Sequence, residues 1–110
     1  MSAITTHVLD VALGRPAAGV PVVLERVAGT EVTEIGRART DEDGRVRSLG
    51  PANLPQGTYR LVFDTAAYAG PAEQPFFPQV MITFTVHDQA RDYHVPLLLS
   101  PFGYSTYRGS

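Results

Sequence analysis

The sequence predicts an all-β fold, an antiparallel β-sandwich of seven to eight strands with one short helix. Ten glycines and nine prolines, spread along the 110 residues, divide the chain into short segments. Many of these segments alternate between apolar and polar residues, with turn signals about every 8–12 positions, which is typical of a sandwich. The chain shows no βαβ spacing, no glycine-rich phosphate loop and no internal repeat.

Three strands are expected in the first part of the chain. Residues 4–13 alternate and are rich in β-branched side chains, so they predict a strand, and a turn follows over 14–19. Residues 20–28 predict a second strand. Residues 30–40 are more polar and predict a third strand near an edge of its sheet. Asp and Gly in the segment 41–44 stand where a tight turn requires them.

The middle of the chain predicts two strands and the only helical turn. Residues 45–49 predict a short strand, and 50–57 predict a loop. Residues 58–65 carry apolar side chains at every second position, which indicates a half-buried strand. The alanine-rich segment 66–70 predicts a short helix, and 71–78 predicts a loop that two aromatic residues anchor.

Two strands and a short terminal strand are expected in the last part. Residues 79–88 alternate cleanly, whereas 90–100 are apolar on both faces and are therefore expected to be covered on both sides. Pro96 inside that second segment suggests an edge position or a bulge, because proline cannot donate to a sheet ladder. Residues 103–107 predict a last strand.

Composition excludes several classes of function. Without cysteine, disulfides and thiolate chemistry are excluded, and since all nine basic residues are arginine, so is lysine chemistry. A net charge of −2 and the lack of a long apolar run indicate neither a nucleic-acid nor a membrane partner. We expect a single domain over residues 1–110, and a cytoplasmic location because no secretory signal is visible.

Three histidines are the main candidates for chemistry. His7 lies on the more apolar face of its predicted strand, as either a buried structural residue or a base or ligand at a cavity wall. His94 lies on a strand that is apolar on both faces, so it needs a partner, a pocket or a subunit interface. His87 is expected to be a solvated residue at a strand end. Their separate strands and spacing disfavour a metal site.

The remaining polar candidates are ambiguous from the sequence. Arg45 follows a tight turn, where it could bind a substrate or simply pair with an acidic residue of that turn, and Arg47 is an equal candidate by spacing. Arg108 could pair with the terminal carboxylate. Two aspartates, Asp10 and Asp64, could brace turns. No local signature of a Ser-His-Asp triad is present.

Five segments carry a resemblance to a known family. "THVLD", "TDEDGR" and "YHVPLLLSPFGYSTYRGS", with "FDTAAY" and "PFFPQVMITFTV", resemble the 5-hydroxyisourate hydrolase family, the transthyretin-like enzymes of urate breakdown; the terminal "YRGS" is the most specific. The resemblance implies a transthyretin-like (prealbumin-like) sandwich of two four-stranded sheets with one short helix. It also implies a homotetramer, a dimer of dimers, with active sites in the channel at the dimer–dimer interface and no metal or cofactor.

The resemblance also implies an activity and its residues. The reaction is hydrolysis of the N1–C6 bond of 5-hydroxyisourate to 2-oxo-4-hydroxy-4-carboxy-5-ureidoimidazoline. One imidazole would activate water, for which His7 is preferred, and the other would bind substrate or relay a proton. The implied catalytic residues are His7, His94 and Ser110. The implied substrate-binding residues are His7, Arg45, His94, Tyr107, Arg108, Gly109 and Ser110. The alternatives are a transthyretin-type carrier of a small hormone-like ligand in the same channel, and a monomeric structural module.

Overall fold

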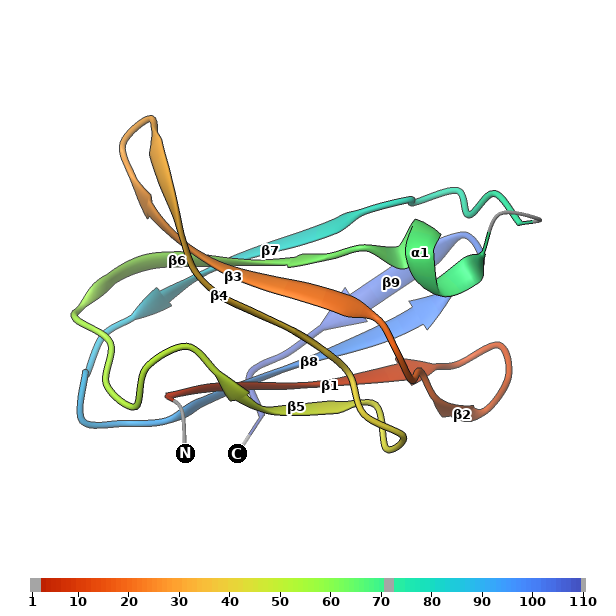
Figure 1. Cartoon of the computed structure of the whole chain (residues 1–110), viewed down its shortest axis with the longest axis horizontal. Helices are drawn as coiled ribbons and strands as arrows, with labels where there is room; N and C mark the ends of the chain where they lie inside the picture. Colours follow the sequence, from red (N-terminus) through yellow and green to blue (C-terminus); the bar gives the residue numbers. More distant parts are fainter. Residues whose placement is uncertain (1–2, 71–72, 110) are drawn as a thin grey trace.

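The computed structural model describes residues 3–70 and 73–109, and it folds them into two packed β-sheets (Figure 1). The first sheet contains β1 (Ile4–Asp10), β2 (Arg15–Pro16), β5 (Arg45–Leu49), β8 (Tyr93–Ser100) and β9 (Gly103–Thr106). The second sheet contains, in spatial order, β4 (Glu31–Arg39), β3 (Pro21–Ala28), β6 (Gly57–Phe63) and β7 (Val80–Val86). A single short helix, α1 (Thr65–Ala69), follows β6. The predicted all-β sandwich with one short helix is confirmed.

One strand pair departs from the antiparallel pattern. β1 and β8 run parallel, with Ile4 opposite Tyr93 and Asp10 opposite Leu99, whereas every other pair of strands in the described residues is antiparallel. A parallel pair needs a long crossover, and here the whole second sheet lies between the two strands in the sequence. Side-chain alternation is the same in both directions, so it could not reveal this pairing.

The first sheet has five strands rather than the four that the resemblance implied. β2 and β5 share one edge of β1: Arg15 pairs with Asp10 near one end of that strand, and Arg45 pairs with His7 further along it. β2 has only two residues and falls in the segment that was predicted as a turn. Because the two strands occupy the same edge, the sheet is at most four strands wide at any level.

Pro96 occupies a central strand, not the edge or bulge suggested by the sequence. β8 lies between β1 and β9, and Pro96 pairs with His7 on the β1 side. On the other side, the β8–β9 ladder ends at the Leu97–Thr106 pair and resumes only as an isolated bridge between His94 and Gly109. Proline lacks the N–H that would continue the ladder at this point. Pro96 therefore separates the end of β9 from the chain end beyond it.

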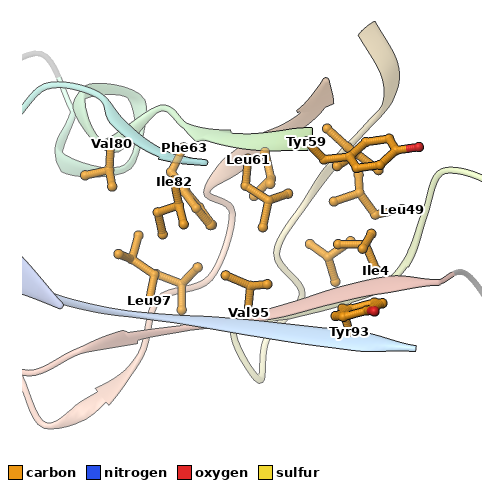
Figure 2. Close-up of a cluster of buried hydrophobic side chains, with 14 of the residues drawn as sticks. Ile4, Leu49, Tyr59, Leu61, Phe63, Val80, Ile82, Tyr93, Val95 and Leu97 are labelled. Carbon is orange, nitrogen blue, oxygen red and sulfur yellow. The ribbon is translucent and has the colours of Figure 1, made fainter. Parts of the chain in front are cut away.

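The core lies between the two sheets, as Figure 2 shows. The alternating residues of β6, Tyr59, Leu61 and Phe63, are fully buried, as their spacing predicted. On β1 the core-facing residues are those two apart from Ile4, and they include Thr6, whose hydroxyl donates to the Val95 carbonyl at 2.5 Å. This hydrogen bond satisfies the buried hydroxyl group, so a threonine is tolerated in the core.

His7 consequently lies on the outer face of the first sheet and is only half-buried. The sequence interpretation placed it on the more apolar face of its strand, and that face proves to be the one turned away from the core. A buried structural histidine is therefore the wrong description of His7, because the hydrogen-bonded Thr6 takes the core-facing position.

Two aspartates brace turns, as expected. Asp64 caps α1 by accepting a hydrogen bond from the backbone N–H of Ala67 at 2.9 Å. Asp10 ends β1 by accepting a hydrogen bond from the Leu13 N–H at 3.0 Å, which turns the chain three residues before the predicted strand end.

Within residues 3–70 and 73–109, no helix is long and apolar enough to cross a membrane.

Candidate functional site

The outer face of the first sheet brings together His7, Arg45 and His94. Strand pairing places Arg45 beside His7, and it places Thr5, two residues before His7, beside His94. Residues two apart on a strand share a face, and neighbouring strands lie about 4.8 Å apart. The three side chains therefore project from one small area of the sheet. The site is built from β1, β5 and β8, which lie side by side in Figure 1.

His94 has neighbours on both sides. On the β1 side, the Thr5 hydroxyl oxygen Oγ1 lies 2.8 Å from the ring nitrogen Nδ1. On the other side, the backbone N–H of Gly109 donates to the His94 carbonyl at 2.8 Å. Gly109 lies so close that a Cβ there would come within 2.5 Å of the ring atom Cδ2. Only a residue without a side chain fits against this ring in its present position.

The surroundings of His94 keep its imidazole neutral. Burial lowers the pKa of His94 below its ordinary value of 6.5, and the Arg45 charge and His7 act in the same direction. A hydrogen bond with the backbone of Thr5 opposes these effects. The net direction is downward, so at neutral pH the ring has a nitrogen lone pair that can accept a proton.

Arg45 does not form the surface ion pair that the sequence left open. Arg47, two residues along β5, pairs instead with Asp41 of the turn, with 3.0 Å between Nη1 and Oδ2. Arg45 contacts Asp41 through its backbone: its N–H donates to the Asp41 carboxylate at 2.9 Å, and its carbonyl accepts from the Asp41 N–H at 2.9 Å. Among the residues that the structure describes, the Arg45 guanidinium takes part in no ion pair. Its charge helps to lower the pKa of His94, and it also contributes to the lowered pKa of Asp41.

The chain end reaches the cluster through Gly109. The Arg108 guanidinium lies over the Tyr93 ring, 4.9 Å from its centroid, which is a cation–π contact. Because Tyr93 and His94 are consecutive in β8, their side chains point to opposite faces of the sheet. The structure therefore does not bring the Arg108 guanidinium to the histidines. The Tyr107 side chain is exposed, and Ser110 lies outside the described residues.

His87 lies apart from the cluster of His7, Arg45 and His94, because it follows a strand of the second sheet. β7 ends at Val86, and His87 follows it as an exposed residue on the second sheet, as predicted. In the described part of the chain, no three His, Asp or Glu side chains gather as metal ligands. Thr5 is the neighbour of His94 that sequence reasoning missed; its position two residues before His7 was the only available signal.

A cavity of about 580 Å³ lies elsewhere, beside α1 and the β8–β9 turn. Its lining includes Tyr68, Phe76, Phe102 and Asp10, and none of His7, Arg45 or His94 reaches it. Tyr68 donates its hydroxyl to the Asp10 carboxylate at 2.7 Å. Burial and this carboxylate raise the pKa of Tyr68 to about 12. The phenol therefore stays protonated near neutral pH and acts as a structural donor.

Fold and site together define a class of protein: a two-sheet β-sandwich with an imidazole–guanidinium cluster on the outer face of one sheet. The profile of the HIUase/Transthyretin family matches residues 4–109. The chain is 48% identical to the 5-hydroxyisourate hydrolase of Deinococcus radiodurans, over 97% of this chain and 95% of that protein. The chain therefore belongs to the HIUase/Transthyretin family.

Solved structures show the same fold. Klebsiella pneumoniae 5-hydroxyisourate hydrolase is similar with a TM-score of 0.87 and 36% identity, over the full length of both chains. Sea bream transthyretin in complex with thyroxine is similar with a TM-score of 0.87 and 32% identity, over 97% of this chain and 94% of that one. The fold is thus shared by an enzyme and a thyroxine-binding protein, so the site must distinguish between these activities.

Proposed function

We propose that this protein is a hydrolase of urate catabolism that converts 5-hydroxyisourate to 2-oxo-4-hydroxy-4-carboxy-5-ureidoimidazoline, acting as a single domain without a metal. The observation that carries the proposal is the convergence of His7, Arg45 and His94 on one sheet face. The 48% identity to a named 5-hydroxyisourate hydrolase supports it. Binding of an apolar ligand by a carrier does not require two imidazoles and a guanidinium at this position.

The reaction requires three groups that this face supplies. Water adds through its oxygen to the C6 carbonyl carbon, the N1–C6 bond breaks, and a water proton ends on N1. A neutral imidazole accepts the proton as water attacks, which accelerates such steps by about 10²–10⁴-fold. The lowered pKa of His94 supports it in this role. His7, which the sequence interpretation preferred as the base, would then bind substrate and relay the proton from the His94 imidazolium to N1, which leaves both imidazoles neutral again.

Arg45 would bind the substrate and the tetrahedral intermediate. The substrate is small, planar, rich in oxygen and anionic near neutral pH. A guanidinium can hold two of its oxygens at once and stabilise the negative charge that develops on the C6 oxygen. Tyr107, Gly109 and Ser110 would close the pocket. Arg108 would contribute by anchoring the chain end on Tyr93, where its guanidinium lies.

The direct test is an ultraviolet absorbance assay with freshly prepared 5-hydroxyisourate. This compound decays unaided, so the expected result is a faster loss that is proportional to protein concentration. A carrier would bind the compound without accelerating its loss. Decay at the unaided rate, in protein with an intact β-sheet circular dichroism spectrum, would refute the proposed activity.

We further propose a cytoplasmic homotetramer, a dimer of dimers. Its assembly would cover the outer face of the first sheet, where His7, Arg45 and His94 lie. Half-buried Leu9 and Leu98 lie on this face beside the histidines, and large apolar side chains are exposed elsewhere. The most exposed are Phe76 and Phe102, at 67% and 81%. Sedimentation equilibrium is expected to return four times the chain mass of 11.9 kDa. A monomer mass would contradict the proposed assembly.

Cell fractionation should recover the protein from the cytoplasm. Recovery outside the cytoplasm would contradict the proposed location.

Replacing Arg45 by Gln is expected to raise the pKa of His94, because a positive charge that disfavours the imidazolium is removed. A base works in its neutral form, so activity falls as pH drops through its pKa. The acid limb of the kcat/KM profile should therefore move to higher pH. NMR titration of the substrate-free protein measures the same pKa directly.

Arg47→Gln is the matched control for this shift, since Arg47 lies two residues along β5 and is not among the groups that act on His94. It should leave the pKa of His94 in place. An Arg45→Gln protein whose His94 titrates as in the wild type would show that the two side chains are not coupled.

A further inference from the structure

The imidazole of His94 is held at two opposite positions of its ring. Thr5 Oγ1 lies 2.8 Å from Nδ1, and Gly109 packs against Cδ2 so closely that a Cβ would approach it within 2.5 Å. Nδ1 and Cδ2 are the two ring atoms bonded to Cγ, so they flank the base of the ring. The remaining nitrogen, Nε2, is on the distal edge. Of the two ring nitrogens, Nε2 is thus the one left to meet a substrate or a water molecule.

The Thr5 hydroxyl contact offers an acceptor for a proton on Nδ1. A neutral imidazole has one N–H donor and one lone-pair acceptor. Thr5 Oγ1, 2.8 Å from Nδ1, can accept a hydrogen bond from Nδ1–H. A proton held on Nδ1 would therefore be satisfied by the threonine oxygen. The lone pair is then on Nε2.

We infer that Thr5 is a positioning residue, which accepts the Nδ1–H of His94 and thereby presents the Nε2 lone pair to the attacking water. This inference rests on the proposed function, in which His94 takes the proton from water. The parallel pairing of β1 and β8 creates the contact, since it sets Thr5 directly opposite His94. Thr5 acts through His94 and has no other part in the reaction.

The first experiment compares Thr5→Val with Thr5→Ser. Valine keeps the β-branched shape and removes the hydroxyl, whereas serine keeps the hydroxyl. Loss of one hydrogen bond to the ring is expected to lower kcat about tenfold in Thr5→Val, with KM nearly unchanged. Thr5→Ser should recover most of the activity. Equal activity of wild type and Thr5→Val would overturn the inference, as would a serine variant as slow as the valine variant.

The second experiment reads the tautomer without substrate. Long-range ¹H–¹⁵N NMR spectra should show hydrogen on Nδ1 and a lone pair on Nε2 of His94 in the wild type and Thr5→Ser, and a mixture of tautomers in Thr5→Val. Hydrogen on Nε2 in the wild-type protein would overturn the inference, even if the enzyme is active. Failure of the wild type to accelerate 5-hydroxyisourate loss would refute the proposed function instead, so the two failures are distinguishable.

Discussion

His94→Ala is expected to lower kcat/KM for 5-hydroxyisourate by about 10²–10⁴-fold, because it removes the proposed proton acceptor. The sandwich should remain folded, since His94 lies on the outer face of the first sheet and contributes nothing to the core between the sheets. His7→Ala is expected to cause a loss in the same range. The ultraviolet assay measures both effects, and circular dichroism verifies the fold.

His87→Ala is the matched control for both histidines. His87 is exposed at the end of β7 on the second sheet, so its removal should leave kcat/KM nearly unchanged. If His87→Ala were as damaging as His94→Ala, the assignment of the site to the outer face of the first sheet would be wrong.

Gly109→Ala is expected to lower kcat/KM about 100-fold, through the position of His94 rather than through the stability of the fold. The added Cβ would lie 2.5 Å from Cδ2 of His94, so either the ring or the chain end must move. Displacement of a catalytic group by about 1 Å can cost about 10²-fold in rate. The backbone of Gly109 is not in the left-handed region, and the three atoms nearest to the added Cβ all belong to His94, so alanine introduces strain at that residue.

Gly103→Ala separates this contact from a general effect of replacing glycine near the chain end. Gly103 also lacks a positive φ, and a Cβ there would meet only Ser100 Oγ at 3.6 Å, an ordinary distance. The Gly103→Ala protein should keep nearly full activity. Unchanged activity in Gly109→Ala would show that the packing of the chain end against His94 is not needed for catalysis.

Strands with a clean alternation were predicted well. The segments 58–65 and 79–88 became β6 and β7 with small differences at their ends, because a period of two on a half-buried face is a direct property of the strand. The end of β1 was predicted three residues too late. There the Asp10 carboxylate competes with the ladder by accepting the Leu13 N–H, and apolar alternation does not register such a local hydrogen bond.

The sequence by itself determined the succession of most strands along the chain and the buried faces of β6 and β7, and the family resemblance singled out His7, Arg45 and His94. Only the tertiary structure decided that β1 pairs in parallel with β8, that Thr5 meets His94 across 89 positions of sequence, and that Gly109 packs against the same ring. The physical reason is that alternation along one strand records which side is buried, whereas the choice of neighbouring strand, its direction and its register depend on how both sheets pack.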